Sequence, residues 1–297
     1  DYTVGPTAFL AADLQAQKLR PAARLLKAHV LLLGSERKLD EALDQCILIL
    51  RLARHFDREP MIVSYLVGVA CRGIAVDAAN QVLRTGPVSE SLRDALEAEL
   101  ALHDNMEAFR WALKSERAFG MDSYRAIPGR NWWPIRAMWD DDGAAYLDVI
   151  DQQLKLASQP YSQVAAAPGP AAGSRRAVLT QLAEPAILAA RAAADGNRAT
   201  IRCLRVLNAF QALEQQGDAP APKLSDLRLP AEATTDPFTG EPLKLKKLAE
   251  GWLVYSVGKD LTDDGGKLDD RRSDVGLGPL QPPDGETEKL NSDRQAD

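Results

Sequence analysis

Apolar residues recur every three to four positions through the first half of the chain, which is the spacing of one face of an α-helix. One such face is shared by Leu25, Leu26, His29, Leu32 and Leu33. Proline in a first turn and glycine after a last turn are typical helix boundaries, and Pro21 and Gly34 bracket this segment. The pattern predicts a short helix over residues 7–18, followed by helices over 21–34 and 36–56.

A third helix, predicted over residues 61–84, is the most apolar segment of the chain. A membrane-spanning helix needs about 20 consecutive apolar residues, and Arg72 interrupts this run. We therefore expect a buried helix at the centre of the helical region and no membrane span in this sequence. Further helices are predicted from Ser89 to about Phe119, over 144–157, over 175–194 and over 198–216.

Composition divides the chain into four parts. Residues 1–157 form the predicted all-α domain. Residues 158–174 (SQPYSQVAAAPGPAAGS) are rich in proline, glycine and alanine, which is typical of a flexible linker or a long loop. Residues 175–278 are predicted as helices that lead into strands. The polar residues 279–297 are predicted as a disordered acidic tail.

Alternating apolar and lysine positions begin after Pro242 and predict a half-buried strand containing Leu243 and Leu245. The next run, over 252–257, is apolar on both faces. Because only Ala249–Gly251 separates the two runs, they predict an antiparallel β-hairpin. The expected fold class is therefore α+β and mainly α, with a helical N-terminal domain and a small C-terminal module of helix and antiparallel hairpin.

The net charge of −6 is concentrated at the C-terminal end of the chain. From Asp260 to Asp297, acidic residues outnumber basic ones by six, which accounts for the whole imbalance. The sequence has no stripe of basic residues of the kind that binds nucleic acid. An acidic, glycine-bearing loop suits a cation better than a phosphate.

Catalytic signals are weak in this sequence. Three histidines, His29, His55 and His103, fall on different predicted helices, and no spacing requires them to converge. The cysteines Cys46, Cys71 and Cys203 are expected as small buried residues, with a Cys46–Cys71 bridge as the alternative. No nucleophile elbow, phosphate loop or dinucleotide-binding motif occurs, so we expect a protein that is not an enzyme.

The segment Thr235–Gly266 resembles the C-terminal part of the major pseudopilins of type II secretion and of related type IV pilin-like proteins. The matching features are Asp236-Pro237-Phe238, the Tyr255–Gly258 run, the Gly265-Gly266 pair and Asp274-Val275. The resemblance covers about residues 197–277. This chain has Asp260-Leu261 where the family usually has Asp-Gly, and it lacks the family's long apolar N-terminal helix. Separately, residues 25–53 are similar to one tetratricopeptide-type helical hairpin, without a second copy at the expected spacing.

The resemblance implies a calcium site in the acidic loop, because such pseudopilins bind calcium there. Calcium takes six to eight oxygen ligands from carboxylates and backbone carbonyls on a bent loop. The side-chain candidates are Asp260, Asp263, Asp264 and Asp274. The alternative is a solvated turn that carries ordinary surface aspartates.

A second candidate site is the tryptophan-rich segment RNWWPIRAMW, at residues 130–139. Tryptophan and arginine are typical anchors of protein interfaces, so Trp132, Trp133 and Trp139 are candidates for an interaction surface. The alternative is a loop folded onto the helical core with its indoles buried.

The functional hypothesis follows from the resemblance and from the weak catalytic signals. We expect a non-enzymatic bacterial extracytoplasmic protein, periplasmic or in the cell envelope, that acts in assembly, scaffolding or binding. Its partners are expected to be proteins, in a secretion or pilus-like system. The sequence begins at Asp1, which leaves open a removed N-terminal leader or anchor. The alternative function is a helical-repeat-like adaptor for protein interaction whose C-terminal module is a structural cap.

Overall fold

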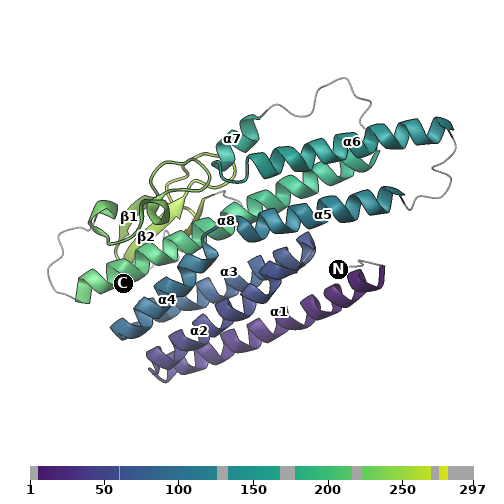
Figure 1. Cartoon of the computed structure of the whole chain (residues 1–297). Coiled ribbons are helices and arrows are strands. Elements are labelled where there is room, and N and C mark those ends of the chain that lie inside the picture. Colours follow the sequence, from purple (N-terminus) through teal and green to yellow (C-terminus); the bar gives the residue numbers. More distant parts are fainter. Residues whose placement is uncertain are drawn as a thin grey trace, which may run out of the picture.

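The expected fold class is confirmed: the chain is mainly α-helical and carries a small antiparallel sheet (Figure 1). The computed structural model describes residues 6–59, 61–125, 133–167, 178–215, 223–268 and 274–279. The helices are α1 (Pro6–Ser35), α2 (Leu39–Ala53), α3 (Ile62–Thr85), α4 (Glu90–His103), α5 (Glu107–Arg125), α6 (Trp133–Lys155), α7 (Tyr161–Ala166) and α8 (Val178–Gln215). Short 3₁₀ turns are η1 (Arg54–Arg58), η2 (Leu224–Asp226) and η3 (Ala231–Thr234), and the strands are β1 (Lys244–Leu248), β2 (Gly251–Ser256) and β3 (Val275–Leu277).

Helix α3 occupies the centre of the helical region, as its apolar sequence predicted. It packs against α1, α2, α5 and α8, and Ala75, Ala78 and Ala79 on its length are fully buried. Small side chains allow the neighbouring helices to approach closely. Among the described residues, α3 is also the one helix that is long and apolar enough to cross a membrane, and half of that stretch is buried inside the protein. The core helix of a soluble protein meets the same length and composition criteria.

Two predicted helix breaks are absent, so two predicted pairs of helices are single long helices. Helix α1 runs through Pro21, and α8 runs through Gly196 and Asn197. In α8 the side chain of Asn197 is held by tertiary structure, because its Oδ1 accepts a hydrogen bond from Arg72 Nε at 2.8 Å. Contacts with distant parts of the chain therefore override the local preference of glycine and asparagine for a helix end.

The α1 face predicted from the sequence is only partly correct. Ala23, Val30 and Leu33 face the core, whereas Leu25 and Leu32 are 73% and 56% exposed. Helix α1 carries leucines around much of its circumference, but it packs on one side only, against α2 and α3. Apolar residues on the other side therefore have no partner among the described residues.

The sheet has the order β1-β2-β3, and both pairs are antiparallel. The hairpin predicted from the sequence is the β1–β2 pair, in which Leu245 lies opposite Val254. One face of β2 lies on α8, where the rings of Trp252 and Phe210 are 5.7 Å apart. The other face is covered by the loop after β2. Gly266 of this loop lies so close to Leu253 that a Cβ added at Gly266 would be 2.6 Å from Leu253 Cδ2. The two apolar faces of this strand are thus both buried.

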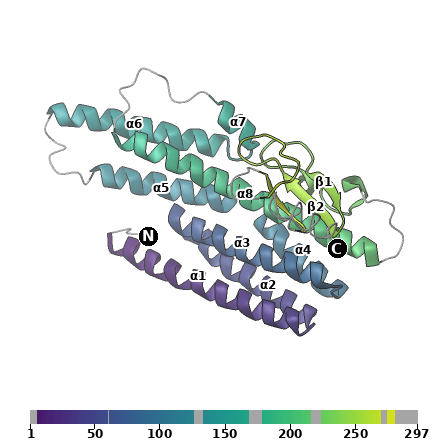
Figure 2. The same ribbon diagram turned by 180° about the vertical axis from the view of Figure 1, so that it is seen from behind.

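Helix α8 connects the helical region to the sheet. In Figures 1 and 2 the sheet lies on α8, across that helix from α1 and α2. One cluster of buried apolar residues runs from Leu43 on α2 through Leu204 on α8 to Val254 and Leu277 in the sheet. A second cluster joins α5, α6 and the first half of α8. Because α8 contributes to both clusters, the described residues on the two sides of the boundary predicted at 158–174 pack against each other, and the division into two parts stays a prediction.

The predicted linker contains a short helix that packs on the sheet module. In α7, the backbone N–H groups of Tyr161 and Ser162 donate to the carbonyls of Pro237 and Phe238 at 3.0 and 2.8 Å. The rings of Tyr161 and Phe238 lie 5.4 Å apart. Residues 158–167 are therefore anchored, while residues 168–174 and the predicted tail from 280 lie outside the described residues.

Candidate functional site

The least expected feature of the fold is a row of buried arginines along α8. Arg191, Arg198, Arg202 and Arg205 are separated by seven, four and three residues, so they share one helical face. The side chain of Arg191 is fully buried, and those of Arg202 and Arg205 are 4% exposed. Buried charges are strongly unfavourable unless they are paired.

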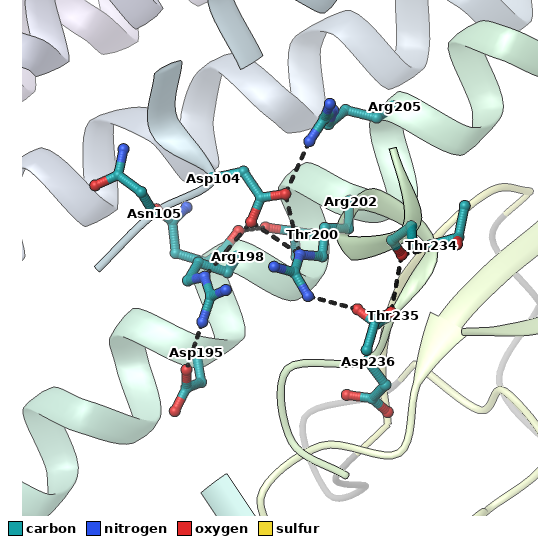
Figure 3. Close-up of polar contacts among 12 residues, drawn as sticks. Asp104, Asn105, Asp195, Arg198, Thr200, Arg202, Arg205, Thr234, Thr235 and Asp236 are labelled. Atoms are coloured by element: carbon teal, nitrogen blue, oxygen red, sulfur yellow. Dashed lines mark hydrogen bonds and ion pairs between the residues drawn. The ribbon is translucent and has the colours of Figure 1, made fainter. Parts of the chain in front are cut away.

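Asp104, just after the end of α4, is the common partner of three of these arginines (Figure 3). Its Oδ1 lies 2.8 Å from Arg202 Nε and 3.4 Å from Arg198 Nε, and its Oδ2 lies 2.8 Å from Arg205 Nη1. The Asp104 side chain is 2% exposed. A carboxylate that accepts several charge-assisted hydrogen bonds in a buried place makes strong, directional contacts. Asp104 therefore fixes the α4–α5 corner on α8.

The same network reaches the sheet module through Arg202. Its Nη1 donates to the backbone carbonyl of Thr235 at 2.7 Å (Figure 3). The next residue, Asp236, is buried, and its Oδ1 accepts hydrogen bonds from the backbone N–H of Phe238 and from Ser256 Oγ at 2.8 and 2.7 Å. Its Oδ2 accepts from the N–H of Val257 at 3.1 Å. The turn predicted at Asp236-Pro237 is thus a junction that joins the helices to strand β2.

A second buried ion pair holds the first half of α8 against the end of α6. Arg191 Nε donates to Asp195 Oδ2 at 2.6 Å, and its two Nη atoms donate to the carbonyls of Leu156 and Gln159. Burial raises the pKa of Asp195, and the charges of Arg191 and Arg198 oppose that rise. Guanidinium groups stay protonated in proteins, so the arginines of both clusters act as fixed positive charges. Both clusters position elements of the fold.

The acidic loop brings some, but not all, of the predicted cation ligands together. Asp274 is buried, and its Oδ2 accepts a hydrogen bond from the N–H of Gly266 at 2.8 Å. Asp263 Oδ1 accepts from Gly265 N at 3.0 Å and from the Tyr255 hydroxyl at 3.1 Å. Asp260 is exposed and accepts from the N–H of Thr262 at 3.1 Å. Within the ranges that the structure describes, no three Asp, Glu, His or Cys side chains gather closely enough to hold a metal ion.

One oxygen of this loop fits a cation. Asp274 Oδ1 is buried and accepts no hydrogen bond from the described residues. Burial raises the pKa of Asp274, the backbone N–H groups of Gly266 and Asp264 oppose that rise, and the nearby charges of Asp263 and Asp264 add to it. A calcium ion would be bound by Asp274 Oδ1 with Asp263 or Asp264 from the facing turn, and it would neutralise their mutual repulsion.

The residue after Asp260 in this loop, Leu261, has an unusual backbone conformation. Leu261 has φ = 61°, which lies in the left-handed region that glycine adopts without strain. Leu261 therefore adopts a backbone conformation that glycine would adopt with less strain.

The second half of the tryptophan-rich segment is helical, because α6 begins at Trp133. Trp132 lies outside the described residues, and Trp133 and Trp139 are described only as backbone positions in helix α6. The expected loop is therefore wrong for residues 133–139, which form the first turns of α6, while an interaction surface at Trp133 and Trp139 stays a prediction.

The three histidines do not converge. His29 and His55 are exposed on α1 and η1, whereas the side chain of His103 on α4 is fully buried. Burial, together with the charges of Arg72 and Arg54, lowers the pKa of His103 to about 3. His103 is therefore neutral at physiological pH, beside the buried Glu99, with Nε2 and Oε1 3.4 Å apart. The cysteines are free and buried, and burial raises the pKa of Cys46 to about 12.

Comparison with known proteins adds no relative. The sequence matches no protein-family model, and neither a curated protein nor a solved structure is significantly similar to it.

Sequence reasoning missed the arginine network. The sequence does contain a signal for this network. Arginines recur at helical spacing on the apolar face of α8, where a core face would carry apolar residues only. Asp104 carries no comparable signal, since its partners lie about 100 residues away in the sequence.

Proposed function

We propose that this protein is a non-enzymatic bacterial extracytoplasmic assembly or binding protein with a pseudopilin-like module, in a secretion or pilus-like system. Two features support the module: a long helix lies against a small antiparallel sheet, and an acidic, glycine-bearing loop follows strand β2. The observation that carries the binding role is on α1. Leu25 and Leu32 lie seven residues apart on one helical face and are largely exposed.

This face is suited to a protein partner. Contiguous exposed apolar side chains are typical of protein interaction sites, and Leu31 on α1 is also 48% exposed. Ala28 lies between Leu25 and Leu32 on the same face and is exposed. Removing two exposed leucines should change the free energy of unfolding little, so binding and folding can be separated.

The experiment is photo-crosslinking in the native cells, with a photoreactive residue in place of Ala28. We expect one discrete adduct, which the double variant Leu25→Ser/Leu32→Ser removes while its melting temperature stays close to that of the parent. The matched control carries the photoreactive residue at Glu107 on α5, whose side chain is 81% exposed. Equal adducts from both positions, or adducts that persist in the double variant, would exclude α1 as the binding face.

The adaptor with a structural cap remains the second candidate, and one observation favours it. Leu277 and Val254 of the sheet belong to the same buried cluster as the helices of the N-terminal region. If the sheet is only a cap, substitutions on the acidic loop should leave the Ala28 adduct unchanged. If the pseudopilin-like module takes part in assembly, substitutions at the loop should alter the set of adducts.

A further inference from the structure

A cleft of about 350 Å³ lies between α4 and α8 and is bordered by the segment from Asp226 to Leu229. It adjoins the arginine network, because Arg205 and Glu97 belong to both. Its walls include Arg93, Glu97, Arg205, Asn208, Leu213 and Leu227. The cleft is independent of the acidic loop and of the exposed face of α1.

Asn208 is one of the residues that line this cleft, and its amide oxygen has no donor among the described residues. The residue is 5% exposed, and its Nδ2 donates to the carbonyl of Arg93 at 3.1 Å. A carbonyl can only accept, so this contact fixes which end of the amide is the oxygen. Asn208 Oδ1 is buried and accepts no hydrogen bond within the described ranges. A buried acceptor without a donor is unfavourable, so Oδ1 favours a ligand that brings one.

Glu97 supplies a second free acceptor at the same cleft. Its Oε1 accepts from Arg205 Nε at 2.9 Å and from Arg205 Nη2 at 2.7 Å. Its Oε2 is buried and has no hydrogen-bond partner in the described parts of the chain. The carboxylate therefore has one oxygen committed to the network and one available to a ligand.

Of the three arginines that line the cleft, Arg228 is exposed at the rim, and the two buried ones already have partners. Arg205 uses Nε and Nη2 on Glu97 and Nη1 on Asp104, and Arg93 Nη1 donates to the carbonyl of Val88 at 2.6 Å. The exposed rim adds three carboxylates, Glu90, Asp94 and Asp226, against the single guanidinium of Arg228, so its formal charge is negative. The cleft thus offers acceptors and negative charge, while Leu213 and Leu227 offer apolar contact.

We propose that this cleft binds an organic cation with N–H donors and a short apolar stem, an alkylammonium or alkylguanidinium group. The ammonium or guanidinium donates to Glu97 Oε2 and Asn208 Oδ1, and the stem packs against Leu213 and Leu227. The group belongs either to a free amine or to a lysine or arginine side chain. This site goes beyond the assembly role proposed above and does not depend on it.

The test is isothermal titration calorimetry on the full chain with n-butylammonium chloride. We expect saturable binding with a dissociation constant on the order of millimolar, as is usual for so small a ligand. n-Butylguanidinium should bind comparably. Two control ligands separate the contributions: n-butanol has the stem without the charge, and tetramethylammonium has the charge without N–H donors. The proposal would be overturned if either control ligand bound with the same dissociation constant as n-butylammonium. It would also be overturned if n-butylammonium showed no saturable binding.

The decisive variant is Glu97→Gln. It keeps a carbonyl oxygen for Arg205 and replaces the free carboxylate oxygen with an amide nitrogen, so binding should weaken about tenfold. Glu107→Gln, at an exposed position of α5, is the matched control and should bind as the parent does. Equal affinity of Glu97→Gln and the parent would refute the assignment.

If Glu97→Gln does not fold, Ala212→Leu tests the same cleft without touching the network, because Ala212 lies on its wall. It should abolish binding by filling the space, and unchanged binding would place the ligand elsewhere. Tighter binding of N-acetyl-lysine methylamide than of n-butylammonium would assign a peptide side chain as the source of the cation, and equal or weaker binding would assign a free amine.

Discussion

Arg202 and Asp104 form a buried ion pair, with Nε 2.8 Å from Oδ1, although 98 residues separate them in the sequence. The two side chains are 4% and 2% exposed. Since Arg202 also donates to the carbonyl of Thr235, one guanidinium group joins the α4–α5 corner, α8 and the sheet module. The relative position of helices and sheet is therefore set by directional contacts as well as by apolar packing.

Replacing Asp104 with alanine should destabilise the protein strongly. Arg202 and Arg205 would then be left buried with fewer partners, and breaking a buried ion pair from one side typically costs about 3–5 kcal/mol. Urea unfolding measures the change. The control is Asp151→Ala, which removes an exposed ion pair with Arg117 at 3.1 Å and should cost at most about 1 kcal/mol. Similar losses in the two variants would mean that the network contributes no more than a surface pair.

Two glycines on α3 should respond to alanine in opposite directions. A Cβ on Gly68 would lie 2.9 Å from Phe56 Cβ, so Gly68→Ala should crowd the contact with η1 and destabilise by about 1–3 kcal/mol. A Cβ on Gly73 meets nothing within 4 Å, so Gly73→Ala should stabilise the helix by roughly 0.5–1 kcal/mol. Thermal or urea unfolding of both variants checks the packing of α3, and a stabilising Gly68→Ala would show that η1 is not held against it.

The sequence predicts the helices and the hairpin well, because their signals are local. The central position of α3 and the β1–β2 pair follow from periodicity and from a short turn, and both are confirmed. The third strand, Val275–Leu277, is too short to have a periodic signal and exists because β2 offers it a free edge. The breaks expected at Pro21 and at Gly196 are absent, because the packing of α1 on α2 and α3 and of α8 on its neighbours outweighs the local cost.

The polar sites are less predictable, since their partners are far apart in the chain. Nothing near Asp104 or Asn208 in the sequence indicates that each lies against a helix about 100 residues away. For the acidic loop, composition indicates the right segment, yet it does not distinguish the buried Asp274 from the exposed Asp260. That difference arises from the docking of the loop onto β2.

Leu261→Gly should stabilise the protein. Leu261 has φ = 61°, and a left-handed backbone costs a residue with a β-carbon about 1–2 kcal/mol. Glycine removes that strain but loses more chain entropy on folding, so a net gain of roughly 0.5–1 kcal/mol is expected. Leu261→Ala keeps the β-carbon and serves as the control, with no gain in melting temperature. Equal melting temperatures for the glycine and alanine variants would mean that the strain at this position is negligible.

His103 should make stability fall in mild acid. Burial lowers its pKa to about 3 from an ordinary value of 6.5. The unfolded chain therefore binds a proton that the folded protein does not, so the stabilising contribution is complete above pH 6.5 and is lost as the pH falls towards 3. The free energy of unfolding should decrease by up to about 1.4 kcal/mol per pH unit below pH 6.

Urea titrations between pH 7 and pH 4.5 measure this slope. His103→Leu should flatten it, because leucine does not titrate. His55→Gln replaces an exposed histidine and should leave the slope unchanged. If His103→Leu and the parent lose stability in parallel, the acid sensitivity arises elsewhere, for example at the carboxylates of the ion pairs.

Calcium should raise the melting temperature of the full chain, and magnesium should do so less. The charges of Asp263 and Asp264 act unfavourably on the ionised carboxylate of Asp274, whose Oδ1 is buried without a donor in the described ranges. A bound cation would remove this repulsion and stabilise the folded state by mass action. Magnesium requires a tighter octahedron and releases water reluctantly, so this loop should bind it more weakly.

The variant that tests the site is Asp274→Asn, which keeps an acceptor for the N–H of Gly266 but removes the charge. It should lose the calcium-dependent shift in melting temperature, whatever its own stability. Asp226→Asn, on an exposed turn away from the loop, should keep the shift. Identical melting curves of the parent in calcium and in chelator would exclude the site. In that case Asp274 would serve only to hold Gly266, and the loop would be an ordinary turn that covers the outer face of the sheet.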